Sequence, residues 1–306
     1  MLRHRLLPVM GATCVALLGL NGAVMARYFN EEATPPVGVE VLHVPSPEKG
    51  RGPRDVWVWK PHVRNVRTLP VLYFLHGVPG QAGDVFDHGL AAALAANLAR
   101  DGTPFIVAAP DGNGTTRLDT EWADAKDGQD LLETFVLKHV IPAVEGPHLR
   151  DRRHRAIAGF SMGGYGAMNL ALRHPDVFGQ VVSMAGYFHV DDPDGMFGKD
   201  PAVVAANSPD QHVAVARRLR VLLLSGDHDE ESVVTGESQR FKALLDEHHV
   251  PATLTITPGG HDWGWVASQF PALIDFLGRP WHNVERADNL PFGMVSRGMK
   301  RAGHPL

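Results

Sequence analysis

Apolar residues fall in short runs along most of the chain, and segments with helical spacing lie between them. The runs occupy residues 70–75, 105–109, 154–158, 177–184, 221–225 and 253–257. Helical spacing fills residues 86–100, 130–144, 165–173, 232–249 and a last segment that ends at Leu277. Short apolar runs are typical of strands buried on both faces, and their alternation with helices favours parallel pairing. The pattern therefore predicts an α/β fold, with a mostly parallel central sheet flanked by helices on both faces.

Two further strands are predicted before this alternation begins. Residues 37–44 and 55–59 have strand patterns, and a turn rich in proline, glycine and charge separates them at residues 45–53. We expect them to pair antiparallel at one edge of the sheet. The folded domain is expected to span residues 37–280. Residues 281–306 have no clear period and are expected to form a tail that packs through Trp281, Leu290 and Phe292.

Residues 1–26 have the pattern of an export signal. Arg3 and Arg5 supply a positive start, residues 6–20 are apolar apart from Thr13, and Val24-Met25-Ala26 places small residues where a signal peptidase cuts. The apolar stretch is also about long enough to span a bilayer, so an uncleaved anchor is the alternative. We expect a secreted or cell-envelope protein with a polar linker at residues 27–36. Transient membrane contact is expected only through the N-terminal segment.

The charge and the cysteine content of the chain exclude some classes of function. The chain has 29 Lys and Arg against 34 Asp and Glu, a net charge of −5, and no basic run. Nucleic-acid binding needs a basic patch, so no nucleic-acid partner is expected. The one cysteine, Cys14, lies in the signal segment. If that segment is removed, the chain has neither a disulfide nor a cysteine nucleophile.

The most informative stretch is Gly159-Phe160-Ser161-Met162-Gly163, which lies between a predicted strand and a predicted helix. A strand that turns sharply into a helix needs small residues beside the apex, and it exposes the apex serine at the helix N-terminus. Helix N–H groups at that position favour a developing oxyanion. The pattern predicts a nucleophile elbow with Ser161 at its apex. An ordinary glycine-rich turn is the alternative.

Later loops supply the partners that a serine nucleophile requires. A serine hydroxyl needs a base, and the base needs an orienting acid. His261 follows the last predicted strand, and an acidic cluster follows the strand before it; the cluster comprises Asp227, Asp229, Glu230 and Glu231. The order Ser, acid, His is the order of α/β hydrolases. The loop His76-Gly77-Val78 follows a buried strand, so the N–H groups of Val78 and Met162 are the candidate oxyanion donors.

Other polar residues near the predicted carboxyl edge have two interpretations each. Trp122 either lines a substrate pocket or packs under a loop. Asp124 either lines the same pocket or caps the next helix. His76 either contacts substrate or shapes the oxyanion loop. Residues 186–209 are irregular and are the candidate lid. His228 and the pair His248-His249 have no second ligand at helical spacing, so neither a metal nor another cofactor is expected.

Together, Gly159-Phe160-Ser161-Met162-Gly163-Gly164, His76-Gly77 and Gly260-His261-Asp262-Trp263 resemble the esterase family of α/β hydrolases. That family includes esterase D-type S-formylglutathione hydrolases, feruloyl esterases, enterochelin esterases and mycobacterial mycolyltransferases. The resemblance covers about residues 37–280 and implies an α/β-hydrolase fold with a triad of Ser161, Asp229 and His261. Gly226-Asp227-His228-Asp229 matches the Gly-x-x-Asp of related esterases. In mycolyltransferases the acid is a glutamate farther along the chain, so this match favours the esterases.

The resemblance implies an exported serine esterase, or an acyltransferase, that acts on a small-molecule or glycolipid ester. Two other functions remain open from the sequence. A non-catalytic binding protein could use the same fold, because a fold does not determine a function. A peptidase would use the same machinery. An apparently complete triad argues against the binding protein.

Overall fold

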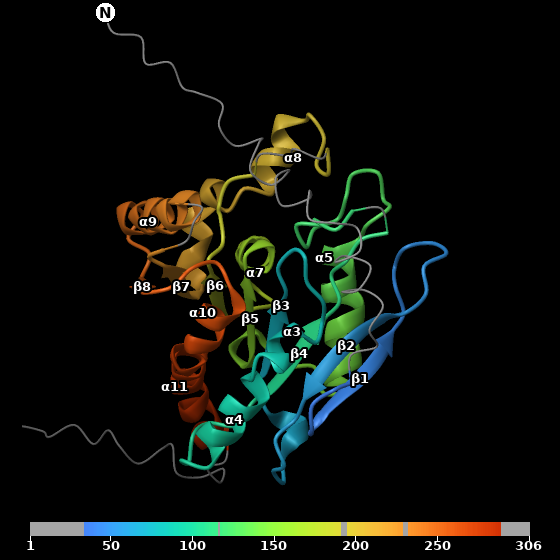
Figure 1. The fold of residues 1–306 in the computed structure, drawn as a ribbon, viewed down its shortest axis with the longest axis vertical. Helices are drawn as coiled ribbons and strands as arrows, with labels where there is room; N and C mark the ends of the chain where they lie inside the picture. Colours follow the sequence, from blue (N-terminus) through green and yellow to red (C-terminus); the bar gives the residue numbers. More distant parts are fainter. Residues whose placement is uncertain (1–33, 116, 191–194, 229–231, 289–306) are drawn as a thin grey trace, which may run out of the picture.

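The structure, a computed structural model, describes residues 34–115, 117–190, 195–228 and 232–288. An eight-stranded sheet runs through the molecule in the order β1-β2-β4-β3-β5-β6-β7-β8. Its strands are β1 Val39–Val44, β2 Arg54–Trp59, β3 Val71–Leu75, β4 Ile106–Pro110, β5 Arg155–Phe160, β6 Gln180–Met184, β7 Arg220–Gly226 and β8 Ala252–Thr257. The sheet is open, with β1 and β8 at its edges (Figure 1).

Strand direction follows the hydrophobic pattern. β1 pairs antiparallel with β2, with Val39 opposite Trp59, and β2 pairs antiparallel with β4. Every other pairing, from β4 through β3 to β8, is parallel. All residues of β3, β4, β5 and β6 are buried, as expected of parallel strands covered on both faces. The predicted α/β fold with an antiparallel edge pair is confirmed.

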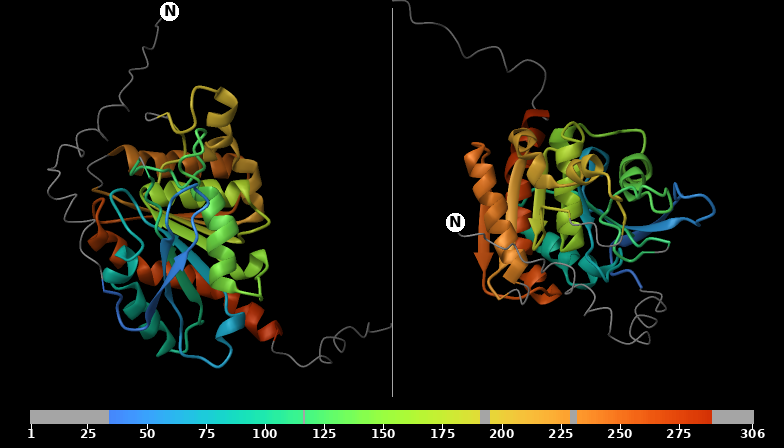
Figure 2. Two further views of the ribbon diagram at one scale, coloured as in Figure 1. Left: turned by 90° about the vertical axis from the view of Figure 1, so that its right-hand side faces the viewer. Right: turned by 90° about the horizontal axis from the view of Figure 1, so that it is seen from above.

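Helices cover both faces of the sheet (Figure 2). They are α3 Asp84–Asp87, α4 Leu90–Leu98, α5 Leu132–Thr134, α6 Ile141–Glu145, α7 Met162–Arg173, α8 Pro201–Ala206, α9 Ser232–Glu247, α10 Trp263–Ser268 and α11 Phe270–Asp288. One hydrophobic cluster lies between the sheet and α7 and α9, and it includes Met168 and Phe241. A second cluster, on the other face, includes Leu94 of α4 and Leu273 of α11. None of the helices in the described ranges is long and apolar enough to cross a membrane.

Two helices differ from their predicted form. The segment predicted as one helix over residues 86–100 is divided between α3 and α4 at Gly89, whose φ of 97° only glycine adopts readily. The segment predicted over residues 130–144 contains a π-helical stretch, Phe135–Val140, between α5 and α6. A π-helix has no signature in hydrophobic spacing, so this difference was not predictable from the pattern.

The C-terminal tail was predicted to begin at residue 281, but the last helix extends beyond that position. Helix α11 continues through Pro280 to Asp288, and Trp281 is part of it. The Trp281 side chain is fully buried, packs against Phe105 at 5.1 Å between ring centres, and donates from Nε1 to the Arg153 carbonyl at 2.8 Å. Burial of this large ring outweighs the helix-breaking tendency of the proline before it. Leu290 and Phe292, the other predicted contacts of the tail, lie outside the described residues.

A buried ion pair ties the turn between β1 and β2 to the loop before α5. Arg54 Nη2 lies 2.6 Å from Glu48 Oε1, and the same oxygen accepts the Leu131 N–H at 3.0 Å. Burial by itself raises the pKa of Glu48, but hydrogen bonds from Arg54, Ser46 and the Leu131 N–H lower the pKa of this carboxyl to about 2. The fold therefore stabilises the charged form.

We predict that Glu48→Gln lowers the free energy of unfolding by about 3 kcal/mol at pH 7. Because the pKa of Glu48 is lower in the folded protein than the usual value near 4.3, its contribution is complete above about pH 4.3 and is lost as the pH falls towards 2. The stabilities of wild type and variant, measured by urea unfolding, should therefore differ by a constant amount above about pH 4.3 and converge as the pH falls from about 4.3 towards 2. Glu40→Gln, which removes an exposed ion pair with Lys60, is the control and should cost under about 1 kcal/mol. A Glu48→Gln deficit that stays constant down to pH 3 would contradict this account.

Candidate active site

Ser161 stands at the junction between β5 and α7, in a conformation that side chains rarely adopt. Its φ is 56° and its ψ is −121°, and it occupies the N-cap position of α7. A non-glycine residue in such a region costs on the order of 1–3 kcal/mol, so the surrounding structure must hold it. Part of that support comes from β6, because the Met184 carbonyl accepts the Ser161 N–H at 2.9 Å. The serine is thus presented at the carboxyl edge of the central strands.

The flanking glycines are needed because three backbone segments meet here. A Cβ atom on Gly163 would lie 2.1 Å from the Leu75 carbonyl oxygen, and one on Gly159 would lie 2.2 Å from the Gly163 oxygen. Both obstacles are backbone atoms, which cannot turn away. The glycine spacing that predicted the elbow therefore reflects direct contact between α7 and the end of β3.

His261 reaches the serine from the other side of the carboxyl edge. It lies in the loop between β8 and α10, and its Nε2 is 2.8 Å from Ser161 Oγ. The His261 ring also packs against Phe160 at 4.7 Å between ring centres. Asp262 caps α10 by accepting the Trp265 N–H at 2.9 Å, which fixes the chain directly after the histidine. A hydroxyl and an imidazole at hydrogen-bond distance can exchange a proton.

The acidic cluster is only partly described. Asp229, Glu230 and Glu231 lie outside the described residues. Asp227 is held in the turn itself: its N–H donates to the Thr257 carbonyl at 2.9 Å, and its Oδ1 accepts the Gly259 N–H at 3.0 Å. These bonds join the ends of β7 and β8, so Asp227 supports the loop that carries His261.

The loop after β3 passes directly over the elbow. A Cβ on Gly77 would approach Ser161 Cβ to 3.1 Å, so the next residue, Val78, enters beside the serine. The Val78–Pro79 peptide bond is cis. Within the described part of the chain, neither the Val78 N–H nor the Met162 N–H donates to another protein group. The Val78 and Met162 N–H groups thus remain the predicted oxyanion donors.

His76 shapes this loop. The side chain is buried, and its Nε2 accepts the Gly112 N–H at 2.8 Å. Because Nε2 accepts, the proton of the neutral ring is on Nδ1, which donates to the Gly77 carbonyl at 2.7 Å. Both ring nitrogens are thus occupied by backbone groups, which supports the loop-shaping interpretation of His76.

The two other candidate pocket residues also have internal roles. Trp122 is fully buried and donates from Nε1 to the His76 carbonyl at 3.0 Å. Asp124 accepts the N–H of Thr134 at 2.9 Å and its hydroxyl at 2.6 Å, at the start of the helix that follows. These contacts support the packing alternative for Trp122 and the capping alternative for Asp124.

Sequence reasoning missed two residues that hold the site together. Asn113 donates from Nδ2 to the Gly80 carbonyl at 2.8 Å and so connects the oxyanion loop to the loop after β4. His88 stacks on Trp263 with 4.9 Å between ring centres and an interplanar angle of 5°. Trp263 in turn contacts Phe160, beside the nucleophile. The Gly260-His261-Asp262-Trp263 motif was the one sequence signal that placed Trp263 near the site. The spacing of residues gave no signal that Asn113 or His88 supports the site.

Among the residues that the structure describes, no three His, Cys, Asp or Glu side chains are grouped so that they could hold a metal ion.

Comparison with known proteins gives a consistent family. The family model Esterase, described as "Putative esterase", matches residues 51–277. Esterase Rv1288 of Mycobacterium tuberculosis is 26% identical over 228 residues, which cover 64% of this chain and 49% of that protein. Diacylglycerol acyltransferase/mycolyltransferase Ag85A of Mycobacterium leprae is 28% identical over 204 residues, covering 65% of this chain and 57% of that protein. The chain thus spans about half the length of these curated relatives.

A solved ferulic acid esterase has the same fold. It superposes with a TM-score of 0.66 and 25% identity, over 79% of this chain and 97% of that one. The residues that the family model matches include every strand from β2 to β8 and the strand–turn–helix that carries Ser161. The chain belongs to the esterase family of α/β hydrolases, as the motifs predicted.

Proposed function

We propose that the protein is a serine esterase that forms an acyl-enzyme on Ser161. The observation that carries this proposal is the 2.8 Å separation between Ser161 Oγ and His261 Nε2 at a strained elbow. Family membership and an esterase among the relatives support it. The substrate would be a small-molecule or glycolipid ester.

In the proposed reaction, Ser161 Oγ attacks the ester carbonyl carbon while His261 Nε2 takes the serine proton. The carbonyl π electrons move onto oxygen, where the N–H groups of Val78 and Met162 and the N-terminus of α7 stabilise the negative charge. Collapse of the tetrahedral intermediate breaks the bond to the alcohol, which leaves with the proton from His261. Asp229 is proposed to orient His261 and to stabilise its charged form.

A second half-reaction releases the acyl group. His261 takes a proton from an acceptor hydroxyl, the acceptor oxygen attacks the acyl carbon, and Ser161 regains its proton. With water the protein is a hydrolase, and with an alcohol or sugar it is an acyltransferase. The Ag85A relative favours keeping the transferase as the second candidate. An ester assay with and without a competing alcohol distinguishes the two by the product formed.

Export is part of the same proposal. The basic, apolar and small-residue segments of residues 1–26 support a signal that is cleaved after Ala26. N-terminal sequencing of the exported protein should therefore begin near Arg27. Recovery of only full-length protein from membranes would favour an uncleaved anchor instead.

We predict that Ser161→Ala reduces ester turnover on the order of a million-fold and abolishes labelling by a fluorophosphonate probe. The substitution removes the attacking oxygen but leaves the glycines of the elbow, so the protein should still fold. Ser268→Ala, which changes a serine on α10 without touching the elbow, is the matched control and should label normally. Labelling that survives in Ser161→Ala would show that another residue is the nucleophile.

For the orienting acid, we predict that Asp229→Asn lowers turnover roughly ten-thousand-fold, because an amide holds the histidine in the wrong tautomer. Asp227→Asn should lose far less, since that carboxylate binds the Gly259 N–H in the turn. Glu230→Gln and Glu231→Gln should also remain close to wild type. If Glu231→Gln lost most of its turnover while Asp229→Asn kept it, the orienting acid would be Glu231, later in the chain. That result would favour the mycolyltransferase arrangement.

A further inference from the structure

The edge of the sheet opposite Ser161 presents a surface that the ester chemistry does not use. The amino ends of the parallel strands lie there, and β3 and β5 are neighbours in the sheet, with Val71 opposite Arg155. The segments that lead into these two strands, residues 60–70 and 146–154, therefore lie side by side. We define the basic apolar face by their exposed side chains Val63, Arg64, Arg67, His148 and Leu149.

Buried polar contacts hold the two segments in place. Arg150 donates from Nε to the Leu69 carbonyl at 3.1 Å and from Nη1 to the His148 carbonyl at 2.9 Å. The Arg150 N–H donates to Glu145 Oε2 at 2.6 Å, and Glu145 is in turn bound by Arg155. Leu149 thus projects from a firmly braced turn with 61% of its surface exposed.

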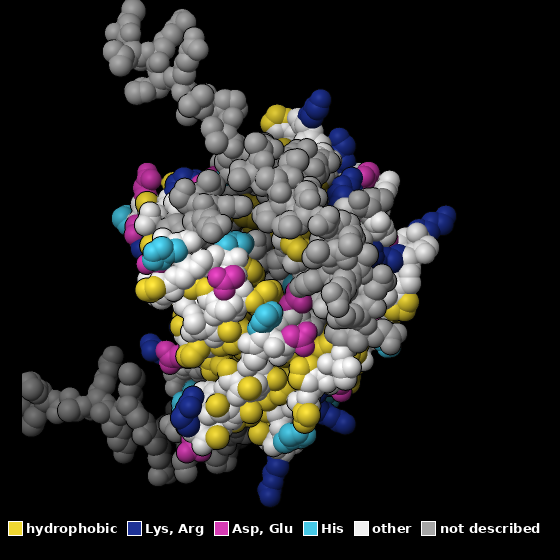
Figure 3. All heavy atoms as spheres, viewed as in Figure 1, with side chains coloured by type: hydrophobic (Ala, Val, Ile, Leu, Met, Phe, Trp, Pro, Cys, Tyr) yellow, Lys and Arg dark blue, Asp and Glu magenta, His cyan; other side chains and the backbone are white. Residues whose placement is uncertain are grey.

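The face carries two arginines that have no ion pair among the described residues, and Glu40, which lines the adjoining groove, is paired with Lys60. Between Asp55 and Asp84 the chain has no carboxylate. Arg64 and Arg67 are exposed, and neither makes an ion pair with any of the residues described. Asp151, the one acid in residues 146–154, is already bound by Arg153 at 2.8 Å and by His154 at 2.8 Å. In Figure 3, dark blue Lys and Arg side chains project from the lower edge, where the loop after β2 lies in Figure 1.

Apolar side chains project from the same surface. Four large hydrophobic residues are exposed in the described chain, and Val63 and Leu149 are two of them. A third, Val37, directly precedes Gly38 at the start of β1. Aliphatic side chains among unpaired basic residues are typical of surfaces that bind the interface of a bilayer, where the apolar groups enter the headgroup region and the cations meet anionic lipids.

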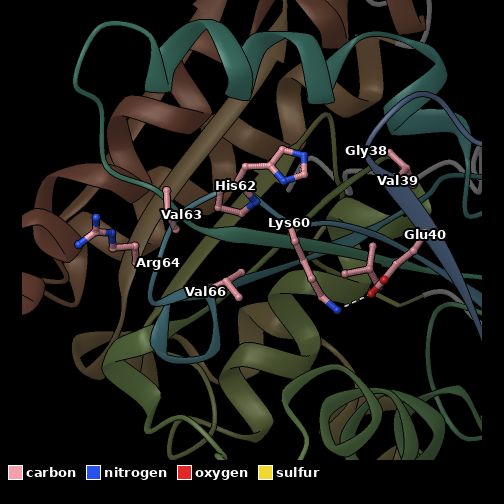
Figure 4. Close-up of a pocket in the computed structure, with 10 residues that line it drawn as sticks. Gly38, Val39, Glu40, Lys60, His62, Val63, Arg64 and Val66 are labelled. Atoms are coloured by element: carbon pink, nitrogen blue, oxygen red, sulfur yellow. Dashed lines mark hydrogen bonds and ion pairs between the residues drawn. The ribbon is translucent and has the colours of Figure 1, made fainter.

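The start of β1 lies at this face. A groove of about 720 Å³ lies between the start of β1 and the loop after β2, and its lining includes Gly38, Val39, His62, Val63 and Arg64 (Figure 4). Val63 and Arg64 therefore belong both to the groove and to the basic apolar face. Gly38 and Val39, at the start of β1, thus lie beside Val63 and Arg64.

We propose that the basic apolar face docks on a lipid bilayer that contains anionic headgroups. The arginines supply the attraction, Val63 and Leu149 enter the headgroup region, and the chain before β1 leaves the domain on the membrane side. This contact is additional to the one expected from the N-terminal segment, and it does not depend on the proposed reaction at Ser161.

The test measures partition of the full chain into vesicles of phosphatidylcholine, with and without phosphatidylglycerol. Each arginine at an anionic surface is worth about 1 kcal/mol, or about fivefold in partition, so Arg64→Gln/Arg67→Gln should weaken binding to the anionic vesicles about thirtyfold. Binding to neutral vesicles should not change. Lys126→Gln/Lys199→Gln removes the same charge from exposed positions near the active-site edge and should behave as wild type. Salt should reduce the wild-type preference for anionic vesicles.

Val63→Ser/Leu149→Ser should weaken binding to both kinds of vesicle. All variants should keep wild-type turnover of a soluble ester and fluorophosphonate labelling, which shows that they fold and separates this proposal from the proposed activity. Wild-type partition of Arg64→Gln/Arg67→Gln into anionic vesicles would overturn the proposal and leave the N-terminal segment as the only contact. A dimer in sedimentation that these substitutions abolish would instead assign the face to a second copy of the chain.

Discussion

The site depends on one close approach, that of α7 to the carboxyl ends of β3 and β5. Gly163 lies against the Leu75 carbonyl with no room for a side chain, and this contact pulls the first turn of the helix down onto the sheet. The short turn that results leaves Ser161 with a positive φ. The same contact brings Gly77 beside the serine, so the proposed nucleophile and the proposed oxyanion loop are positioned together. A change that separates α7 from β3 would therefore disturb both at once.

A network of neutral and charged groups supports that contact from behind. The neutral His76 ring hydrogen-bonds to both the Gly77 carbonyl and the Gly112 N–H. The Asn113 side chain, in the loop after β4, donates to the Gly80 carbonyl. Arg54 extends the network by binding the Asn113 carbonyl and Glu48. The oxyanion loop is thus connected to the antiparallel edge strands, which otherwise take no part in the chemistry. Preorganised donors of this kind are effective because the protein has already met the cost of orienting them.

The elements that could be predicted from the sequence are those with a local cause. Strand burial and the glycines around Ser161 each leave a pattern within a few residues. Features that depend on contacts between distant segments left no such pattern. Trp281 stays helical after Pro280 because it packs on Phe105, and Trp122 is buried because the backbone at Gly112 and Gly166 makes room for it. The predicted tail boundary was wrong for that reason, and the packing of Trp122 could not be told from a pocket-lining role.

The two edges of the sheet also constrain the substrate. Ser161 lies at the carboxyl edge and the basic apolar face at the amino edge, so they are separated by at least the length of a strand, about 17–20 Å. A domain that rests on a bilayer through that face would hold the serine away from the headgroups. An ester embedded in the same bilayer could not reach Oγ from there. Docking would therefore favour esters that approach Ser161 from the aqueous side. Such an ester could be dissolved in water or attached to a larger assembly on the side of the domain away from the bilayer.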